Sequence, residues 1–198
     1  MAALTKTATT PNAWTSLPAG GFSNGAAAIT TTSLDSAIQI TVANVEAVAN
    51  ALGTLVTVTF LTGTGADSHR EQYRFRMAAG TANVQDVGTE SAADQELVLV
   101  AATANFDTVG DWFIIHNTVD VTKSEMRQIQ TLVTDTSITV VGDLINTQET
   151  SAKLYDLVET KRVPIPLDIR EVDISLWNDD ADCDVIYQIG QTIVTAIG

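Results

Sequence analysis

Few residues in this sequence could carry out acid–base or nucleophilic chemistry. It contains two histidines, His69 and His116, so a catalytic set of serine or cysteine, histidine and carboxylate has few possible forms. His116 lies at the end of an expected strand and His69 lies beside a loop, and we interpret them as an ordinary strand-end residue and a solvated one. The sequence motifs of serine hydrolases, zinc proteases, P-loop proteins and dinucleotide-binding proteins do not occur. We therefore expect a protein that is not an enzyme and has no cofactor.

The single cysteine, Cys183, lies between Asp182 and Asp184. Because adjacent carboxylates disfavour the thiolate, we expect a raised thiol pKa and a poor nucleophile. One cysteine can form neither an internal disulfide nor a structural thiolate zinc site. Cys183 is therefore expected to be a small buried side chain in a fold held by packing and hydrogen bonds.

A cluster of carboxylates near the C-terminus is the best candidate for a metal site, and it comprises Asp179, Asp180, Asp182 and Asp184. Ca²⁺ prefers oxygen ligands of this kind. The segment lacks the spacing and the glycine of an EF-hand loop, however. Two interpretations stay open, a weak cation site and a solvated hairpin turn between Trp177 and Val185.

The charge balance limits the possible partners. With 10 Lys and Arg against 24 Asp and Glu, the formal net charge is −14. Such an acidic surface repels phosphates and anionic lipids, so neither nucleic acid nor membrane is an expected partner. The charge suits either simple solubility or docking on a surface with basic patches.

One stretch departs from this acidity. Between His69 and Met77, arginines alternate with apolar side chains, which predicts a strand with a basic outer stripe of Arg70, Arg74 and Arg76. The stripe is either a solvated strand face or a contact with carboxylates of a partner or a neighbouring subunit.

Composition and periodicity predict an all-β fold. Apolar residues make up 45% of the chain and charged residues 17%, and β-branched Thr and Val are abundant. Short alternating segments recur at intervals of about 8–12 residues, which is typical of a sandwich or barrel. The expected strands are 37–43, 54–61, 69–77, 84–87, 97–100, 112–116, 125–133, 137–141, 153–158, 169–177 and 185–194.

Two positions in this series are less regular. The apolar residues between Val42 and Leu52 also fit helical spacing and end at Gly53, so a short helix is an alternative there. Pro164 and Pro166 are expected in a link between strands, because proline cannot donate to a ladder. We predict a sandwich or jelly-roll-like core.

An extended N-terminal arm, residues 1–28, is expected to precede a β-rich domain of residues 29–198. The arm is rich in Thr, Ala, Gly, Ser and Asn, and Trp14 and Phe22 are its only large side chains. We interpret these aromatics as interface anchors that pack on the domain or on a neighbouring subunit, with a disordered tail as the alternative. The N-terminus has no apolar core of a signal peptide, so we expect synthesis in the cytoplasm without export through a cleaved signal.

The segment 96–158 carries the most informative pattern. A strand leads to the turn Val109-Gly110-Asp111, and strands with the patterns Glu125-x-Arg127-x-Ile129 and Thr136-x-Ile138-Thr139-Val140 follow. Gly110 can adopt the positive φ of a tight turn, Asp111 can hydrogen-bond its backbone, and Phe106 and Val109 would cap the end of the barrel or sandwich. This third of the chain resembles a small β module of bacteriophage virion proteins, although the loop 117–124 is longer than in that module.

The resemblance implies a capsid decoration (cement) protein. Such a protein binds the major capsid protein on the virion surface, commonly as a homotrimer, after assembly in the host cytoplasm. Multivalent attachment would then raise the avidity of individually weak contacts. Two rivals stay open, a tail, neck or fibre-associated component of the virion and a receptor- or glycan-binding module. Three Trp and three Tyr are a small supply of aromatic platforms for the latter.

Overall fold

The computed structural model describes residues 4–8, 12–23, 29–30, 35–62, 70–100, 106, 108–133, 136–166, 169 and 171–196. Within these ranges the chain is mainly antiparallel β-strand, which confirms the prediction of an all-β protein with a sandwich. None of the helices in the described ranges has the length and hydropathy needed to span a bilayer. His69 and the loop at 63–67 lie outside these ranges.

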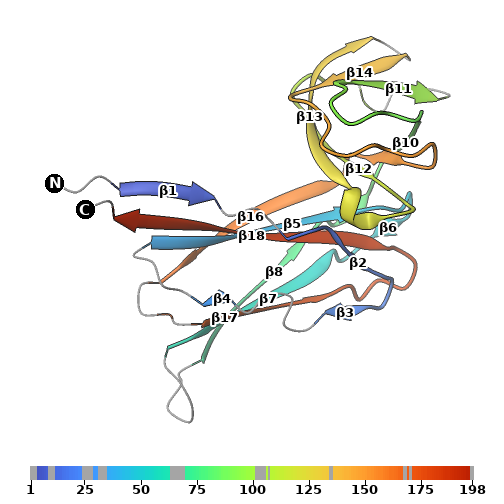
Figure 1. Cartoon of the computed structure of the whole chain (residues 1–198). Coiled ribbons are helices and arrows are strands. Elements are labelled where there is room, and N and C mark those ends of the chain that lie inside the picture. Colours follow the sequence, from blue (N-terminus) through green and yellow to red (C-terminus); the bar gives the residue numbers. More distant parts are fainter. Residues whose placement is uncertain are drawn as a thin grey trace.

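Two sheets make up the sandwich (Figure 1). The first has the order β1-β18-β5-β16, with β2 also paired to β18. The second has the order β3-β17-β7-β8, with β4 also paired to β17. The strands of the first sheet are β1 (Leu4–Ala8), β2 (Thr15–Leu17), β5 (Asp35–Asn44), β16 (Val158–Ile165) and β18 (Val185–Ala196). Those of the second are β3 (Phe22–Ser23), β4 (Ile29–Thr30), β7 (Thr54–Leu61), β8 (Arg70–Met77) and β17 (Glu171–Trp177).

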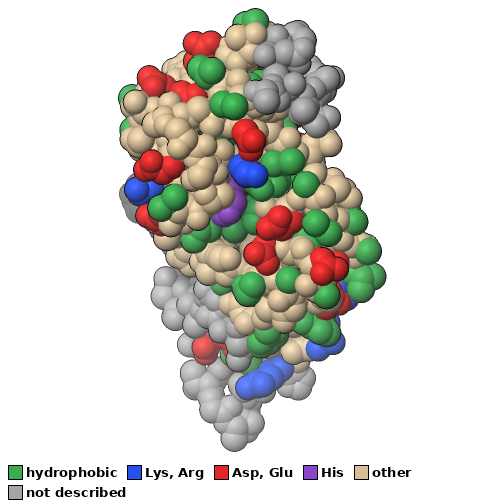
Figure 2. Space-filling model, turned by 90° about the vertical axis from the view of Figure 1, so that its right-hand side faces the viewer, with side chains coloured by type: hydrophobic (Ala, Val, Ile, Leu, Met, Phe, Trp, Pro, Cys, Tyr) green, Lys and Arg blue, Asp and Glu red, His purple; other side chains and the backbone are tan. Residues whose placement is uncertain are grey.

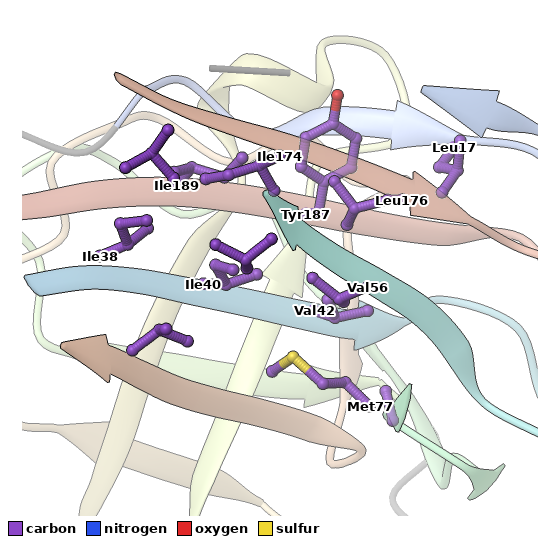
Figure 3. Close-up of a cluster of buried hydrophobic side chains, with 14 of the residues drawn as sticks. Leu17, Ile38, Ile40, Val42, Val56, Met77, Ile174, Leu176, Tyr187 and Ile189 are labelled. Atoms are coloured by element: carbon purple, nitrogen blue, oxygen red, sulfur yellow. The ribbon is translucent and has the colours of Figure 1, made fainter. Parts of the chain in front are cut away.

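The sandwich core follows directly from strand alternation. Ile38, Ile40 and Val42 of β5 point to the interior of the sandwich, whereas Gln39 and Thr41 between them lie on the opposite face of the sheet, where Gln39 is exposed and Thr41 is buried. Figure 3 shows these side chains meeting those of the opposing sheet, including Val56 and Ile174. Full burial of an aliphatic side chain of this size contributes about 1.5–3 kcal/mol, so this layer is a main source of the sandwich's stability.

A closed barrel forms a second unit with its own core. Its six strands are β10 (Val84–Val87), β11 (Glu96–Val100), β12 (Trp112–His116), β13 (Glu125–Val133), β14 (Ser137–Val140) and β15 (Lys153–Tyr155). Phe113, Ile115, Ile138 and Leu154 are fully buried inside it. Closure pairs both edges of each strand and so removes free edges. The barrel begins at Val84, upstream of the expected module boundary at residue 96.

The barrel lies on the outer face of the first sheet, above β5 and β18 in Figure 1. The junction is apolar: Ile114 and Tyr155 of the barrel cluster with Ala43 of β5, Ile186 of β18 and Trp14. Two short strands, β6 (Ala49–Asn50) and β9 (Gly80–Thr81), pair beside it. The two units are therefore joined by packing as well as by the chain.

The described part of the predicted arm adds strands to the sandwich. β1 and β2 pair with β18 of one sheet, whereas β3 and β4 pair with β17 of the other. The segment is extended, as its composition predicts, because it adds edge strands to both sheets. Residues 1–3, 9–11 and 24–28 of the predicted arm lie outside the described residues.

The helical alternative at 42–52 and the expected proline link are not found. Residues 42–52 form the end of β5, a bend and β6 rather than a helix, although Gly53 does have a positive φ of 72°. Pro164 lies within β16 rather than in a link, opposite Ala37. A proline is tolerated there because β16 is an edge strand, where one side of the backbone has no ladder partner.

The turn at 108–111 is confirmed. Gly110 has a φ of 98°, and the Asp111 amide donates to the Thr108 carbonyl at 3.2 Å. Phe106 is buried and packs edge-on against Phe113, with ring centroids 6.0 Å apart, so it closes the barrel interior as expected. Val109 is 59% exposed and does not. The longer loop before β13 contains a 3-10 turn, η2 (Val121–Lys123), whose N-cap is Asp120.

Candidate interaction surface

The outer face of the second sheet gathers most of the residues that the sequence nominates for an interface. Strand register places Phe22 opposite Trp177, Trp177 opposite Leu55, and Leu55 opposite Arg76. Directly opposed residues point to the same face of a sheet, so these four form one row across it. Phe22 is 63% exposed and Trp177 is 44% exposed. We call this set, together with the arginines of β8, the docking face.

The arginine stripe lies along one margin of the docking face. Arg70, Arg74 and Arg76 are alternate, exposed residues of β8, the edge strand of the sheet. Arg74 donates to the Gln72 side chain at 2.7 Å, and in the described part of the chain neither Arg70 nor Arg74 has a carboxylate partner. Their charge is therefore open to a partner.

Arg76 is held in place by an acidic residue of its own chain. Its guanidinium forms two hydrogen bonds with the Asp179 carboxylate, at 3.0 and 2.9 Å. The pair raises the pKa of Arg76 and lowers the pKa of Asp179. This bidentate contact fixes the orientation of Arg76 beside Leu55 and Trp177.

The remaining charges on this face are segregated. Glu171 and Asp173 of β17 face outward on the far side of β7, which presents Thr57 and Thr59 between the two charged strands. A partner would thus meet a basic margin, a small polar centre and an acidic strip, with the aromatic row at one end.

The opposite side of β8 is closed by a lysine. Lys161 of β16 places its Nζ 4.2 Å from the Phe75 ring centroid and 5.6 Å from that of Tyr73. The two rings lie 5.4 Å apart. A charged side chain that points inward over aromatic rings at the open edge of a sandwich hinders pairing with a strand of another chain. Contacts with the face of the sheet are therefore favoured over strand addition at its edge.

Trp14 is not part of the docking face. It is 3% exposed and packs against Ala43, Ile114 and Ile186 at the junction of the two units. The sequence leaves open whether Trp14 packs on its own domain or on a neighbouring subunit, and its burial corresponds to packing on its own domain. Trp14 is therefore an internal anchor and is not accessible to a partner.

The four C-terminal aspartates do not converge. Asp179 binds Arg76, Asp180 accepts from the Asp182 amide at 2.9 Å, and Asp184 accepts from the Ala19 amide at 2.8 Å. Across the described ranges, no three His, Cys, Asp or Glu side chains gather in an arrangement that could hold a metal ion. The geometry favours the hairpin-turn interpretation.

Cys183 and His116, the described residues that could act as a nucleophile or a base, are shielded from solvent, fully for Cys183 and partly for His116. Burial raises the pKa of Cys183 to about 12, with Asp180, Glu46 and Asp184 as smaller causes, so the neighbouring carboxylates are not the main reason for the expected inertness. The Cys183 thiol donates to Asn44 Oδ1 at 3.0 Å. Burial also lowers the pKa of His116, whose Nδ1 lies 3.3 Å from the Ser124 hydroxyl.

A buried ionic cluster in the barrel has a structural explanation. Glu125 is 4% exposed and pairs with Arg127, and its carboxylate accepts from the Ile145 and Asn146 amides and from the Gln148 side chain. Arg127 in turn donates to the Asp143 carbonyl at 3.0 Å. The lone pairs of the carboxylate are thus used to hold the loop after β14. The Glu-x-Arg pattern of β13 does not by itself distinguish this buried cluster from two solvated charges on a strand.

No family model matches the sequence, and no curated protein matches it. Among solved structures the chain is weakly similar to VP17, a capsid protein of bacteriophage P23-77. The identity is 9%, the alignment covers 97% of this chain and 100% of that chain, and the TM-score is 0.19. A TM-score this low does not establish a shared fold, so the likeness assigns neither a fold nor a function.

Proposed function

We propose that this chain is a structural protein of a bacteriophage particle that binds and stabilises the assembled capsid shell as a decoration protein. The observation that carries the proposal is the docking face. It combines two exposed aromatic side chains, Phe22 and Trp177, with the basic stripe of β8. The resemblance of segment 96–158 to a module of phage virion proteins supports the same role.

The composition of the docking face is typical of protein–protein contacts. Aromatic residues and arginine are enriched at interfaces and dominate their hot spots. Elsewhere the surface is acidic, and Figure 2 shows carboxylates spread over both the barrel and the sandwich. The expected partner is therefore the major capsid protein, through an area with an apolar patch opposite the aromatic row and acidic groups opposite Arg70 and Arg74.

We further propose that the protein acts as a homotrimer on the capsid surface. A shell offers the same contact many times, so several linked copies would bind with an avidity far above that of one contact. A face of moderate size with few aromatic anchors is sufficient under such multivalent attachment.

The test is co-sedimentation with capsid shells of the parent phage that lack the protein. The double variant F22A/W177A is expected to bind at least about tenfold more weakly, the loss of roughly 1.4 kcal/mol that a hot-spot residue typically exceeds. The variant R70E/R74E should also bind more weakly, and binding of the unmodified protein should fall as salt rises. The control Ile145→Ala removes an exposed apolar side chain from the barrel and should bind like the unmodified protein.

Unchanged binding by both double variants would overturn the assignment of the docking face. Absence of binding to shells, combined with binding to isolated tails or fibres, would overturn the capsid role in favour of another virion position. Electron microscopy of particles treated to release the protein separates these outcomes, since loss of surface knobs differs from loss of a tail.

A further inference from the structure

A groove of about 310 Å³ lies where the barrel meets the outer face of the first sheet. Residues from both units line it, and they are Gln39, Trp112, Met126, Val158 and Thr160. Small-molecule sites range from about 300 to 1,000 Å³, so the groove has room for a small ligand. It is not part of the docking face, which belongs to the second sheet.

The barrel supplies an aromatic wall. Trp112 is the first residue of β12 and is 50% exposed, although the next three residues of the same strand are buried. Its cross-strand partner is Gln128 of β13, and Met126 lies two residues earlier in that strand. Val158, the first residue of β16, extends the apolar lining. A large indole surface is therefore presented at the side of an open groove.

The first sheet supplies a polar floor. Gln39 of β5 and Thr160 of β16 both face outward and are exposed. The Thr160 hydroxyl lies 3.0 Å from that of Thr41, which orients it. In the described part of the chain the Gln39 amide has no hydrogen-bond partner, and Gly190 stands opposite it on β18 without a side chain. The amide is thus open to a ligand on its β18 side, whereas exposed Arg162 of β16 stands opposite it on the other side.

This combination fits one class of ligand. A pyranose ring has an apolar C–H face that stacks on an indole and a rim of hydroxyl groups that need both donors and acceptors. Trp112 offers the stacking surface, and the side chains of Gln39 and Thr160 offer donors and acceptors. The lining contains no charged side chain, and the net charge of −14 disfavours anionic ligands. We propose that the groove binds one or two residues of a neutral saccharide.

The proposal goes beyond capsid binding and is compatible with it. The two sheets of the sandwich present their outer faces in opposite directions (Figure 1). The docking face belongs to the second sheet, and the groove lies on the first. A protein held to a shell by the docking face would therefore keep the groove open to the surroundings of the particle.

The test uses the full-length protein on an array of immobilised neutral and sialylated oligosaccharides, followed by calorimetric titration with the strongest neutral hit. Neutral sugars are expected to bind, with Trp112→Ala lowering the affinity by about tenfold or more and Gln39→Ala by severalfold. Val133→Ala is the matched control, since it removes an exposed apolar residue from the far end of β13. It should leave the affinity unchanged.

Trp112 is half exposed, so the Ala variant should keep the melting profile of the unmodified protein, and circular dichroism checks this. No hit on the array would overturn the proposal, as would exclusive binding of sialylated sugars or equal affinity in the Trp112→Ala protein. Because the array contains no capsid protein, each of these results leaves the assignment of the docking face untouched.

Discussion

At the scale of single residues, the buried carboxylate of Glu125 has a structural role. It satisfies two backbone amides and the Gln148 side chain while it neutralises Arg127. A charged group at 4% exposure is tolerated only because each of these partners is present. The same pattern read from sequence alone resembles a strand with two solvated charges.

We therefore predict that Glu125→Ala lowers the free energy of unfolding by about 3–5 kcal/mol, because it leaves Arg127 unpaired and releases the loop at 143–148. Equilibrium unfolding in urea measures this. The control Glu149→Ala removes an exposed carboxylate of the same loop region and should change stability by less than about 0.5 kcal/mol. Equal effects of the two substitutions would contradict a stabilising role for the contacts of Glu125.

At the scale of elements, the N-terminal segment pairs with both sheets of the sandwich. Trp14 and Leu17 are each 3% exposed, and β2 and β3 join the edges of different sheets. The segment thus ties the two sheets together and also covers the junction with the barrel.

We predict that Trp14→Ala destabilises the protein by about 3–5 kcal/mol, the usual cost of removing a buried Trp or Phe side chain. Phe22→Ala, at 63% exposure, should change stability by less than about 1 kcal/mol. Thermal unfolding of the two variants gives the comparison. A Trp14→Ala protein as stable as Phe22→Ala would show that the segment is dispensable for the fold.

The longer strands other than β16 were predictable because their signal is local, whereas β16 and the short strands β1–β4, β6 and β9 were not expected. Alternation in β8, and the short apolar run after the turn at Gly110 for β12, gave bounds within a residue of those observed. Alternation named Arg70, Arg74 and Arg76 as candidates, whereas Phe22 was named as a large aromatic side chain of the N-terminal segment. Pairing partners were not predictable, since register joins residues far apart in the chain. Trp177 was missed for that reason, as it acquires its position only beside Phe22. The groove depends likewise on Gln39, Trp112 and Thr160 from three separate strands.

At the scale of the whole molecule, the barrel is an insertion between strands β8 and β16 of the sandwich. Val84 at its start pairs with Tyr155 at its end, so the chain enters and leaves at one place. Inside, the barrel has a core separate from that of the sandwich. Units with adjacent ends and a core of their own are the ones that can fold alone.

We predict that a fragment of residues 83–156 folds without the sandwich into a cooperative β structure. It should be less stable than in the whole chain, because Ile114 and Tyr155 lose their cover at the junction. Dispersed amide resonances and a sigmoidal thermal transition would verify folding. A fragment with collapsed resonances and no transition, alongside a full chain that unfolds in one step, would instead mean that the junction around Trp14 is required for the barrel to form.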